Sequence, residues 1–347
     1  MSRARDFADL GSSVDTGGLT GRNLFINGAM QVAQRGTSST ATGMKTVDRF
    51  EVTFSNTDEL AVTQSQSTTV PSGQGFSNSL KVEVTTAENA LASNEFFRII
   101  QRIEAQNLQH LAFGSSSAKP LTLSFWVRSS LAGKYSILFF RGDASPSRSN
   151  TPSYTINAAD TWEYKTITID GDTTGGVIAN DNGQGLNITW TLAAGATYSG
   201  TPHTGWGNYA ATDDFSHSDQ VNFAAQTGTF YLTGVQVEVG GTATPFEHEN
   251  FGTTLAKCQR YYWTNIDALN IGGGTGAGEF FRHVIDWPCR MRAAPTITQS
   301  ISSKNTTGDG SWASQRDNGR YLNSTVTGNI NSSITFAANG IQADAEL

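Results

Sequence analysis

The chain has 347 residues, enough for two domains of ordinary size. Its formal net charge is −7 and only 15% of its residues are charged, so it lacks the clustered Lys and Arg that a nucleic-acid groove requires. No apolar run reaches the length of about 18 residues that a transmembrane helix needs, and the N-terminus has no secretory signal, so we expect no membrane insertion. With 36 glycines and few helical patterns, the chain is predicted to be all-β.

Residues 1–22 are polar and rich in Gly and Ser. Their one amphipathic pattern consists of Phe7, Leu10 and Val14, with Arg5 beside it. A segment of this composition does not bury a core of its own, so we expect an attachment peptide that docks on another protein or on sister copies. The alternative is a tail folded back on its own domain.

Residues 23–250 alternate apolar and polar positions between turn-rich connections, which predicts a jelly-roll β-sandwich. Residues 96–111 are predicted to form a strand followed by a helical turn. The other strands are expected at 24–34, 48–55, 60–66, 79–86, 120–129, 134–141, 153–157, 163–170, 185–193 and 229–239.

Residues 251–347 are predicted to form a smaller β-rich domain. Its glycine-rich stretch Asn270–Gly278 indicates a hairpin or loop, and Ile341–Leu347 indicates a closing strand. Between them, Phe280–Arg292 has a strand pattern that Pro288 interrupts.

Three motifs occur in order along the chain. They are NLFINGAMQ at Asn23–Gln31, LTLSFWVRS at Leu121–Ser129, and the sequence Gly234–Tyr262 that contains GVQVEVG, ATPFE and CQRYY. Together they resemble phage tail-fibre and other virion appendage proteins, in which a jelly-roll domain similar to a carbohydrate-binding module precedes a C-terminal domain. The resemblance covers roughly residues 23–262.

This resemblance implies a homotrimeric virion tail fibre, made in the host bacterial cytoplasm, which recognises host-surface polysaccharide. Its partners would be sister subunits and another virion protein bound by the N-terminal peptide. One alternative is a purely architectural tail adaptor or capsid-decorating fibre that binds no sugar. The other is a glycan depolymerase.

The sequence contains no motif of a known catalytic constellation, so we expect no enzymatic activity. Glycosidases use paired carboxylates. The acidic pairs present are Asp170/Asp172, Asp213/Asp214 and Glu247/Glu249, and each lies in or beside a turn, where solvated side chains are expected.

No cofactor is expected, apart from a structural calcium ion as one candidate. Asp170, Asp172 and Asp181 lie in oxygen-rich, glycine-containing turns of the kind that calcium favours. Ordinary turn chemistry accounts for the same residues.

Sugar recognition needs aromatic rings beside polar groups, and strand parity sorts the tryptophans. Trp190 shares a face with Leu186 and is predicted to be core, whereas Trp126 falls on the polar face of its strand with Arg128. Trp126 therefore indicates a sugar platform or, alternatively, a ring under a loop or against a neighbouring subunit. Three further side chains, Arg98, Arg102 and Glu104, are expected on the same face.

The stretch 195–220 lacks a regular pattern and is rich in aromatic residues. Long loops of this kind are often functional, so Tyr198, Trp206 and Tyr209 are predicted receptor contacts. The alternative is that these rings cover the edge of the sandwich or seal a subunit interface.

Overall fold

The structure is a computed structural model. The chain divides into two compact units, Met1–Asn250 and Phe251–Leu347, and each is described by itself. The structure describes residues 21–265, 267, 269–273, 280–283, 287–305, 322–325 and 332–347. The proposed attachment residues Arg5, Phe7, Leu10 and Val14 lie outside these ranges.

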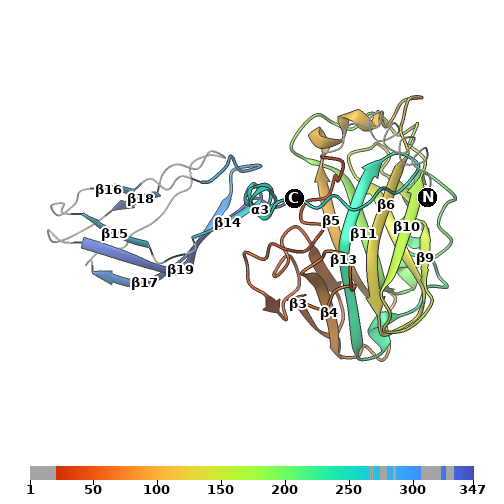
Figure 1. The fold of residues 1–347 in the computed structure, drawn as a ribbon, viewed down its shortest axis with the longest axis horizontal. Coiled ribbons are helices and arrows are strands. Elements are labelled where there is room, and N and C mark those ends of the chain that lie inside the picture. Colours follow the sequence, from red (N-terminus) through yellow and green to blue (C-terminus); the bar gives the residue numbers. More distant parts are fainter. Residues whose placement is uncertain are drawn as a thin grey trace. The chain divides into compact units, whose positions relative to one another are not determined.

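The first sheet of unit 1 has six strands, all paired antiparallel (Figure 1). Strand β13, the last of the unit, lies between β4 and β6, so the centre of the sheet is completed only by the end of the domain sequence. In order across the sheet the strands are β1 (Ser38–Ser39), β3 (Ala61–Ser67), β4 (Ser79–Thr86), β13 (Gly228–Val239), β6 (Leu121–Ser129) and β10 (Glu163–Ile169).

The second sheet has seven strands, also antiparallel. The order is β12 (Gly207–Asn208), β8 (Arg148–Asn150), β7 (Gly133–Arg141), β11 (Gln184–Ala194), β5 (Phe96–Glu104) and β2 (Glu51–Ser55), with β9 (Ser153–Ile156) paired to β7. The helical pieces of the unit are η1 (Ala105–Leu111), η2 (Ala196–Tyr198), α2 (Ala211–Asp214) and η3 (Phe223–Ala225).

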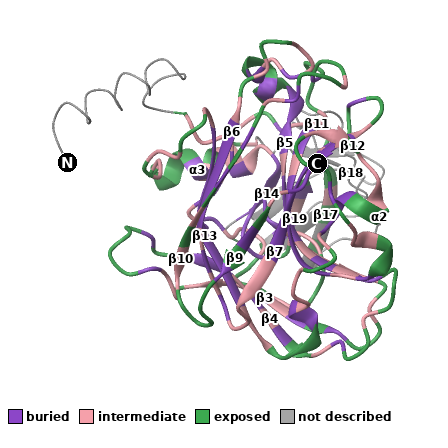
Figure 2. Cartoon of the chain, turned by 90° about the vertical axis from the view of Figure 1, so that its right-hand side faces the viewer, coloured by how far each residue is buried: buried purple, intermediate pink, exposed green. Residues whose placement is uncertain are grey.

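The core lies between the two sheets, where the apolar faces of their strands meet (Figure 2). Trp190 is fully buried there, as predicted, and its ring lies 5.7 Å from Phe125 of the other sheet and 6.0 Å from Phe25. Burying one large apolar side chain contributes about 1.5–3 kcal/mol, so this continuous layer is the main stabilising feature of the unit. The all-β sandwich predicted from the sequence is confirmed.

The strand predicted over 24–34 is wrong. This segment is a series of turns in which Asn27 and Met30 have positive φ angles of 63° and 58°. The Asn27 side chain satisfies the local backbone, because its Nδ2 donates to the carbonyl oxygens of Val32 at 2.9 Å and Asp48 at 3.0 Å. The alternation of apolar residues in this segment therefore reflects the burial of one side of the chain, and no strand pairing accompanies it.

The same segment docks on β13 through its side chains. Asn23 accepts a hydrogen bond from the Val237 amide at 3.0 Å and donates to the Val235 carbonyl at 2.9 Å. A Cβ on Gly28 would lie 2.0 Å from that carbonyl oxygen, so only glycine fits. The Glu247 carboxylate also binds this segment, because it accepts a hydrogen bond from the Asn23 amide at 3.0 Å.

The described part of unit 2 begins with helix α3 (Phe251–Gln259). Strand β19 pairs with three others and is longer than the closing strand predicted over Ile341–Leu347. A small core of Met291, Ala343 and Ala345 packs with Trp263 and Trp287. The strands are β14 (Tyr262–Thr264), β15 (Leu269–Gly273), β17 (Thr296–Asn305) and β19 (Ser332–Asp344), with β16 (Phe280–His283) and β18 (Leu322–Thr325) as a separate pair. Within the described ranges, no helix has the length and apolar character to cross a membrane.

Candidate functional site

Trp126 and Tyr164 form an aromatic pair on the outer face of the first sheet. They are register partners on β6 and β10, and their ring centroids are 5.4 Å apart. Leu123 and Phe125 of β6 point into the core, so Trp126, with the opposite parity, has its ring outside. Tyr164 is 43% exposed. The exposed Tyr164 ring thus lies beside the half-buried Trp126 ring on this face.

A second aromatic pair extends the first. Trp162 and Tyr231 have ring centroids 6.0 Å apart, and the Arg128 guanidinium lies 5.5 Å above the Tyr231 ring. Arg128 is the register partner of Tyr231 and also pairs with Asp160 at 3.4 Å. We call the four rings Trp126, Tyr164, Trp162 and Tyr231 the aromatic band.

Gly234 gives the band its shape in the middle of β13. The β13–β6 register shifts between Thr233 and Gln236, and Gly234 has a φ of +59° at this bulge. A Cβ there would lie 2.5 Å from the Phe76 ring and 3.1 Å from the Trp126 ring. Both rings therefore pack directly over the glycine backbone.

The accessible polar groups beside the band are charged, because Thr122 of the same face is fully buried and its hydroxyl donates to the Gly240 carbonyl at 2.8 Å. The hydroxyls of Thr122 and Thr168 are hydrogen-bonded at 3.0 Å. Lys81 is the register partner of Tyr231 and pairs with Glu83 at 2.7 Å. Ligand sites commonly combine rings, which give apolar contact, with polar groups, which orient the ligand by hydrogen bonds. The aromatic band and its neighbours have this composition.

Arg102 lies on the outer face of the other sheet, because β5 belongs to the second sheet. The expectation that Arg98, Arg102 and Glu104 share a face with Trp126 is therefore wrong: parity shows which side of a strand a residue occupies, but not which sheet the strand joins. Arg102 forms an ion pair with Glu51 of β2. Burial raises the pKa of Glu51, but the Arg102 charge and further hydrogen bonds outweigh it and leave the pKa below its usual value.

The stretch 195–220 separates its three predicted contact residues. Tyr198 packs on Phe96 and Phe215 with ring centroids 5.3 Å from each, and Tyr209 packs on Phe140 at 4.8 Å. Both lie on the outer side of the second sheet, half-buried. This agrees with the alternative that part of the loop covers the sandwich, since Phe215 is buried beneath it.

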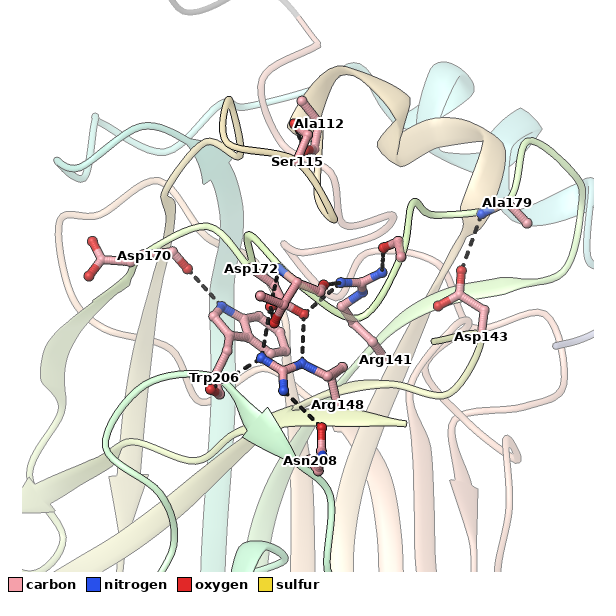
Figure 3. A network of polar contacts seen from close by, with 12 residues as sticks. Ala112, Ser115, Arg141, Asp143, Arg148, Asp170, Asp172, Ala179, Trp206 and Asn208 are labelled. Carbon is pink, nitrogen blue, oxygen red and sulfur yellow. Dashed lines mark hydrogen bonds and ion pairs between the residues drawn. The ribbon is translucent and has the colours of Figure 1, made fainter. Parts of the chain in front are cut away.

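Trp206 belongs instead to a buried polar network at the end of the sandwich (Figure 3). Its indole Nε1 donates to the Asp170 carbonyl at 2.7 Å, and its carbonyl accepts from Arg148 at 3.2 Å. The Asp172 carboxylate pairs with Arg141 at 2.6 Å and with Arg148 at 3.0 Å. The polar groups of Trp206 are thus occupied by contacts within the chain.

The calcium candidates do not come together. Asp172 is engaged by two arginines, and it forms no ligand group with Asp170 and Asp181 among the residues that the structure describes. The one group of three acidic side chains found there consists of Asp58, Glu88 and Glu95, whose oxygens lie within 4.8 Å of one another. Glu88 and Glu95 each accept hydrogen bonds from backbone amides, which gives these buried carboxylates a structural role.

One member of each acidic pair also has a structural role. Asp172 pairs with the two arginines, and Glu247 accepts hydrogen bonds from the backbone amides of Arg22 and Asn23. Asp214 accepts from the Ala210 amide at 2.7 Å and lies 3.1 Å from His203. The absence of enzymatic activity stays a prediction.

Three residues of the aromatic band, Tyr164, Trp162 and Tyr231, were not predicted from the sequence. The sequence does indicate the position of Tyr164. Ile167 and Ile169 of the predicted strand point into the core, and Tyr164 has the opposite parity, so its side chain is expected on the outer face. Trp162 precedes that strand and Tyr231 lies on β13, so only the sheet order brings their rings together.

No protein-family model matches the sequence, and no curated protein matches it. Solved structures are similar at low identity. The enzymatically active domain of tailspike protein 4 from bacteriophage CBA120 is 13% identical with a TM-score of 0.35, and the match covers 62% of this chain and 21% of that one. This chain thus spans about a fifth of the tailspike chain that it matches.

Two carbohydrate-binding modules are similar as well. The family 11 module from Clostridium thermocellum, solved with a β-1,3-1,4-mixed-linked tetrasaccharide, is 12% identical with a TM-score of 0.29, covering 61% of this chain and 98% of that one. The N-terminal cellulose-binding domain of Cellulomonas fimi β-1,4-glucanase C is 11% identical with a TM-score of 0.28, covering 61% and 99%. Because these TM-scores are low, the sandwich architecture rests on the strand pairing of this chain itself.

Proposed function

We propose that this chain is a non-enzymatic virion protein, a homotrimeric tail fibre that recognises host-surface glycan through the aromatic band. The aromatic band itself carries the glycan part of the proposal. Pyranose rings present apolar C–H surfaces that pack against aromatic faces, while their hydroxyls bind neighbouring polar groups such as Arg128 and Lys81. The tail-fibre part comes from the resemblance of the three sequence motifs.

A trimer would make weak single sites useful. Three linked copies raise the overall avidity by orders of magnitude without any new contact, provided that all three reach the same surface. The N-terminal segment would supply the attachment to the particle.

Trp126→Ala tests glycan recognition. We expect the variant to lose about tenfold or more in affinity for host polysaccharides on a glycan array, because a central aromatic contact supplies much of the binding energy at such sites. Phe251→Ala is the matched control, since Phe251 is an exposed aromatic residue of the other unit, at 54% exposure.

Three outcomes count against the proposal. Unchanged affinity of Trp126→Ala would remove the aromatic band as the site. Absence of binding to all host polysaccharides by the unmodified chain would favour the purely architectural alternative. Release of new reducing ends from host polysaccharide would favour the depolymerase.

A further inference from the structure

The segment that follows β13 covers one end of the outer face of the first sheet. Its Glu247 amide donates to the Gln236 side chain at 2.8 Å, and its Thr244 amide donates to the Glu238 carboxylate at 2.8 Å. Gln236 and Glu238 are buried beneath it, as are their register partners on β6. A ligand therefore has no access to the sheet at this end.

Three rings form a wall beside the aromatic band. The ring of Phe76 lies 5.0 Å from that of Phe246 and 5.2 Å from that of His248. The Phe76 ring also packs over the Gly234 backbone, next to the Trp126 ring. We call Phe76, Phe246 and His248 the ring wall. Phe76 is buried in it, whereas Phe246 is half-buried and His248 is exposed.

The part of the face that stays open runs across the strands. Register pairing aligns Tyr164 of β10 with Trp126 of β6 and, two residues further along β6, Arg128 with Tyr231 of β13 and Lys81 of β4. All of these side chains except Tyr231 are exposed or half-buried. The order of the strands is β10, β6, β13 and β4 (Figure 1), so at about 4.8 Å per strand the open strip extends about 14 Å. This length suits an oligosaccharide better than a single sugar.

The charges around the open strip do not favour an anion. Both of its basic side chains have an acidic partner, since Arg128 pairs with Asp160 and Lys81 pairs with Glu83. Carboxylates also outnumber basic groups among the other charged residues described on these strands, on the covering segment and at residues 21–23. These are Arg22, Lys165, Glu163, Glu238, Glu247 and Glu249. A neutral glycan therefore fits this surface better than an acidic one.

His248 is the polar group of the ring wall. Phe76 and Phe246 pack against its imidazole at 5.2 Å and 5.0 Å, which restricts its position. The side chain is nevertheless exposed, and it forms no hydrogen bond with any residue that the structure describes. An imidazole nitrogen can donate or accept a hydrogen bond. His248 can therefore bind a sugar hydroxyl without losing a contact within the chain.

We propose that the aromatic band binds a neutral, linear oligosaccharide that lies across β10, β6 and β13, and that His248 forms a hydrogen bond with a hydroxyl of the sugar beside the ring wall. This inference rests on the proposed recognition of glycan by the band. It adds the chemical class and the orientation of the glycan, together with a specificity-determining residue outside the band.

Isothermal titration with fragments of defined length and charge tests this inference. The probes are the disaccharide and the hexasaccharide of the host polysaccharide that binds most tightly on the glycan array. Each probe is used in an uncharged form and in a form with carboxylates at C6, prepared by oxidation of C6 or by reduction of existing carboxyl groups. We expect the uncharged hexasaccharide to bind about tenfold or more tightly than the uncharged disaccharide and than the carboxylated hexasaccharide.

His248→Ala is expected to weaken binding of the uncharged hexasaccharide about fivefold, which is the effect of one lost hydrogen bond. His248→Gln keeps a donor and an acceptor, so it should retain part of the affinity. A purely structural role of His248 would instead give equal losses in the two variants. Val177→Ala is the matched control, since Val177 is 74% exposed on the loop after β10, and its affinity should not change.

Four results overturn this inference and leave glycan recognition by the band in place. The first two are binding of the carboxylated hexasaccharide as tight as that of the uncharged one, and equal binding of disaccharide and hexasaccharide. The others are unchanged affinity in His248→Ala when Trp126→Ala loses binding, and equal losses in His248→Ala and His248→Gln. Binding of no host polysaccharide, or unchanged binding in Trp126→Ala, contradicts the proposed function itself and this inference with it.

Discussion

Asp172 is 1% exposed on its side chain and pairs with the guanidiniums of both Arg141 and Arg148 (Figure 3). Burial by itself raises the pKa of this carboxyl, but the hydrogen bonds from Arg148, Thr174 and Arg141 outweigh burial and lower it. The network joins β7 and β8 to the loop after β10. A sequence shows three charged residues there, yet only the fold makes them one buried group.

Asp172→Asn is expected to lower the free energy of unfolding by about 3–5 kcal/mol at neutral pH, because it leaves two buried guanidiniums without their carboxylate. Urea unfolding measures this. Since the folded pKa is lowered, the stabilisation is fully present above the unfolded value of about 3.9 and is lost as the pH falls through the folded pKa. The difference between the two proteins should therefore shrink in acid.

Asp160→Asn is the matched control for that experiment. Asp160 pairs with Arg128 at 3.4 Å, and its side chain is 58% exposed. Solvent screens such pairs, so a change of less than about 1 kcal/mol is expected. If both variants lose the same small amount, the buried network does not have the role assigned to it.

At the scale of elements, β13 is the strand on which the domain depends. It pairs with β4 and β6, receives the N-terminal motif through Asn23, and carries the bulge beneath the aromatic band. Gln236 and Glu238 of the same strand bind Glu247 and Thr244 of the segment that follows. The motifs at the two ends of the domain sequence thus contact each other.

Gly234→Ala is expected to destabilise the protein by at least about 2 kcal/mol. An alanine at φ +59° costs about 1–2 kcal/mol, and its Cβ must also displace the Phe76 ring from 2.5 Å. Thermal unfolding measures the stability, and glycan titration reports on the band. Gly241→Ala should change neither, because a Cβ there has open space around it. Equal stability of the two variants would contradict the role of the bulge.

At the scale of the whole molecule, the sandwich presents two outer faces of different chemistry on opposite sides. One carries the aromatic band, and the other carries Arg98, whose guanidinium lies over the rings of Phe96 and Phe215. A fibre that brought several copies to a bacterial surface would present both faces repeatedly, so even weak sites would contribute to attachment.

Deletion of residues 2–20 is expected to leave unit 1 folded, because the core of both sheets lies within residues 25–237. If the segment is the attachment peptide, particles assembled in the presence of the shortened protein should lack that protein after purification, while its circular dichroism and glycan binding stay unchanged. Normal incorporation into particles would contradict the attachment role.

Strand alternation in the sequence was sufficient for much of the fold. It predicted the β5 strand with its helical turn, the burial of Trp190 and the outward position of Trp126, because parity is a local property of an extended chain. The strand prediction was wrong over 24–34. There, side-chain hydrogen bonds satisfy the backbone in place of strand pairing, although the apolar residues alternate as they would in a strand.

The composition of the candidate surfaces depends on non-local strand pairing, which cannot be read from the sequence. Which sheet a strand joins is decided by non-local pairing, so Arg102 and Trp126 lie on opposite faces although both were predicted on one. The same pairing brings Tyr164 and Tyr231 into the aromatic band, and the fold places Arg98 over the rings of Phe96 and Phe215. Sequence alone determined the class of fold and the facing of single residues; tertiary structure decided which residues form a surface, because a surface is made by strands that are far apart along the chain.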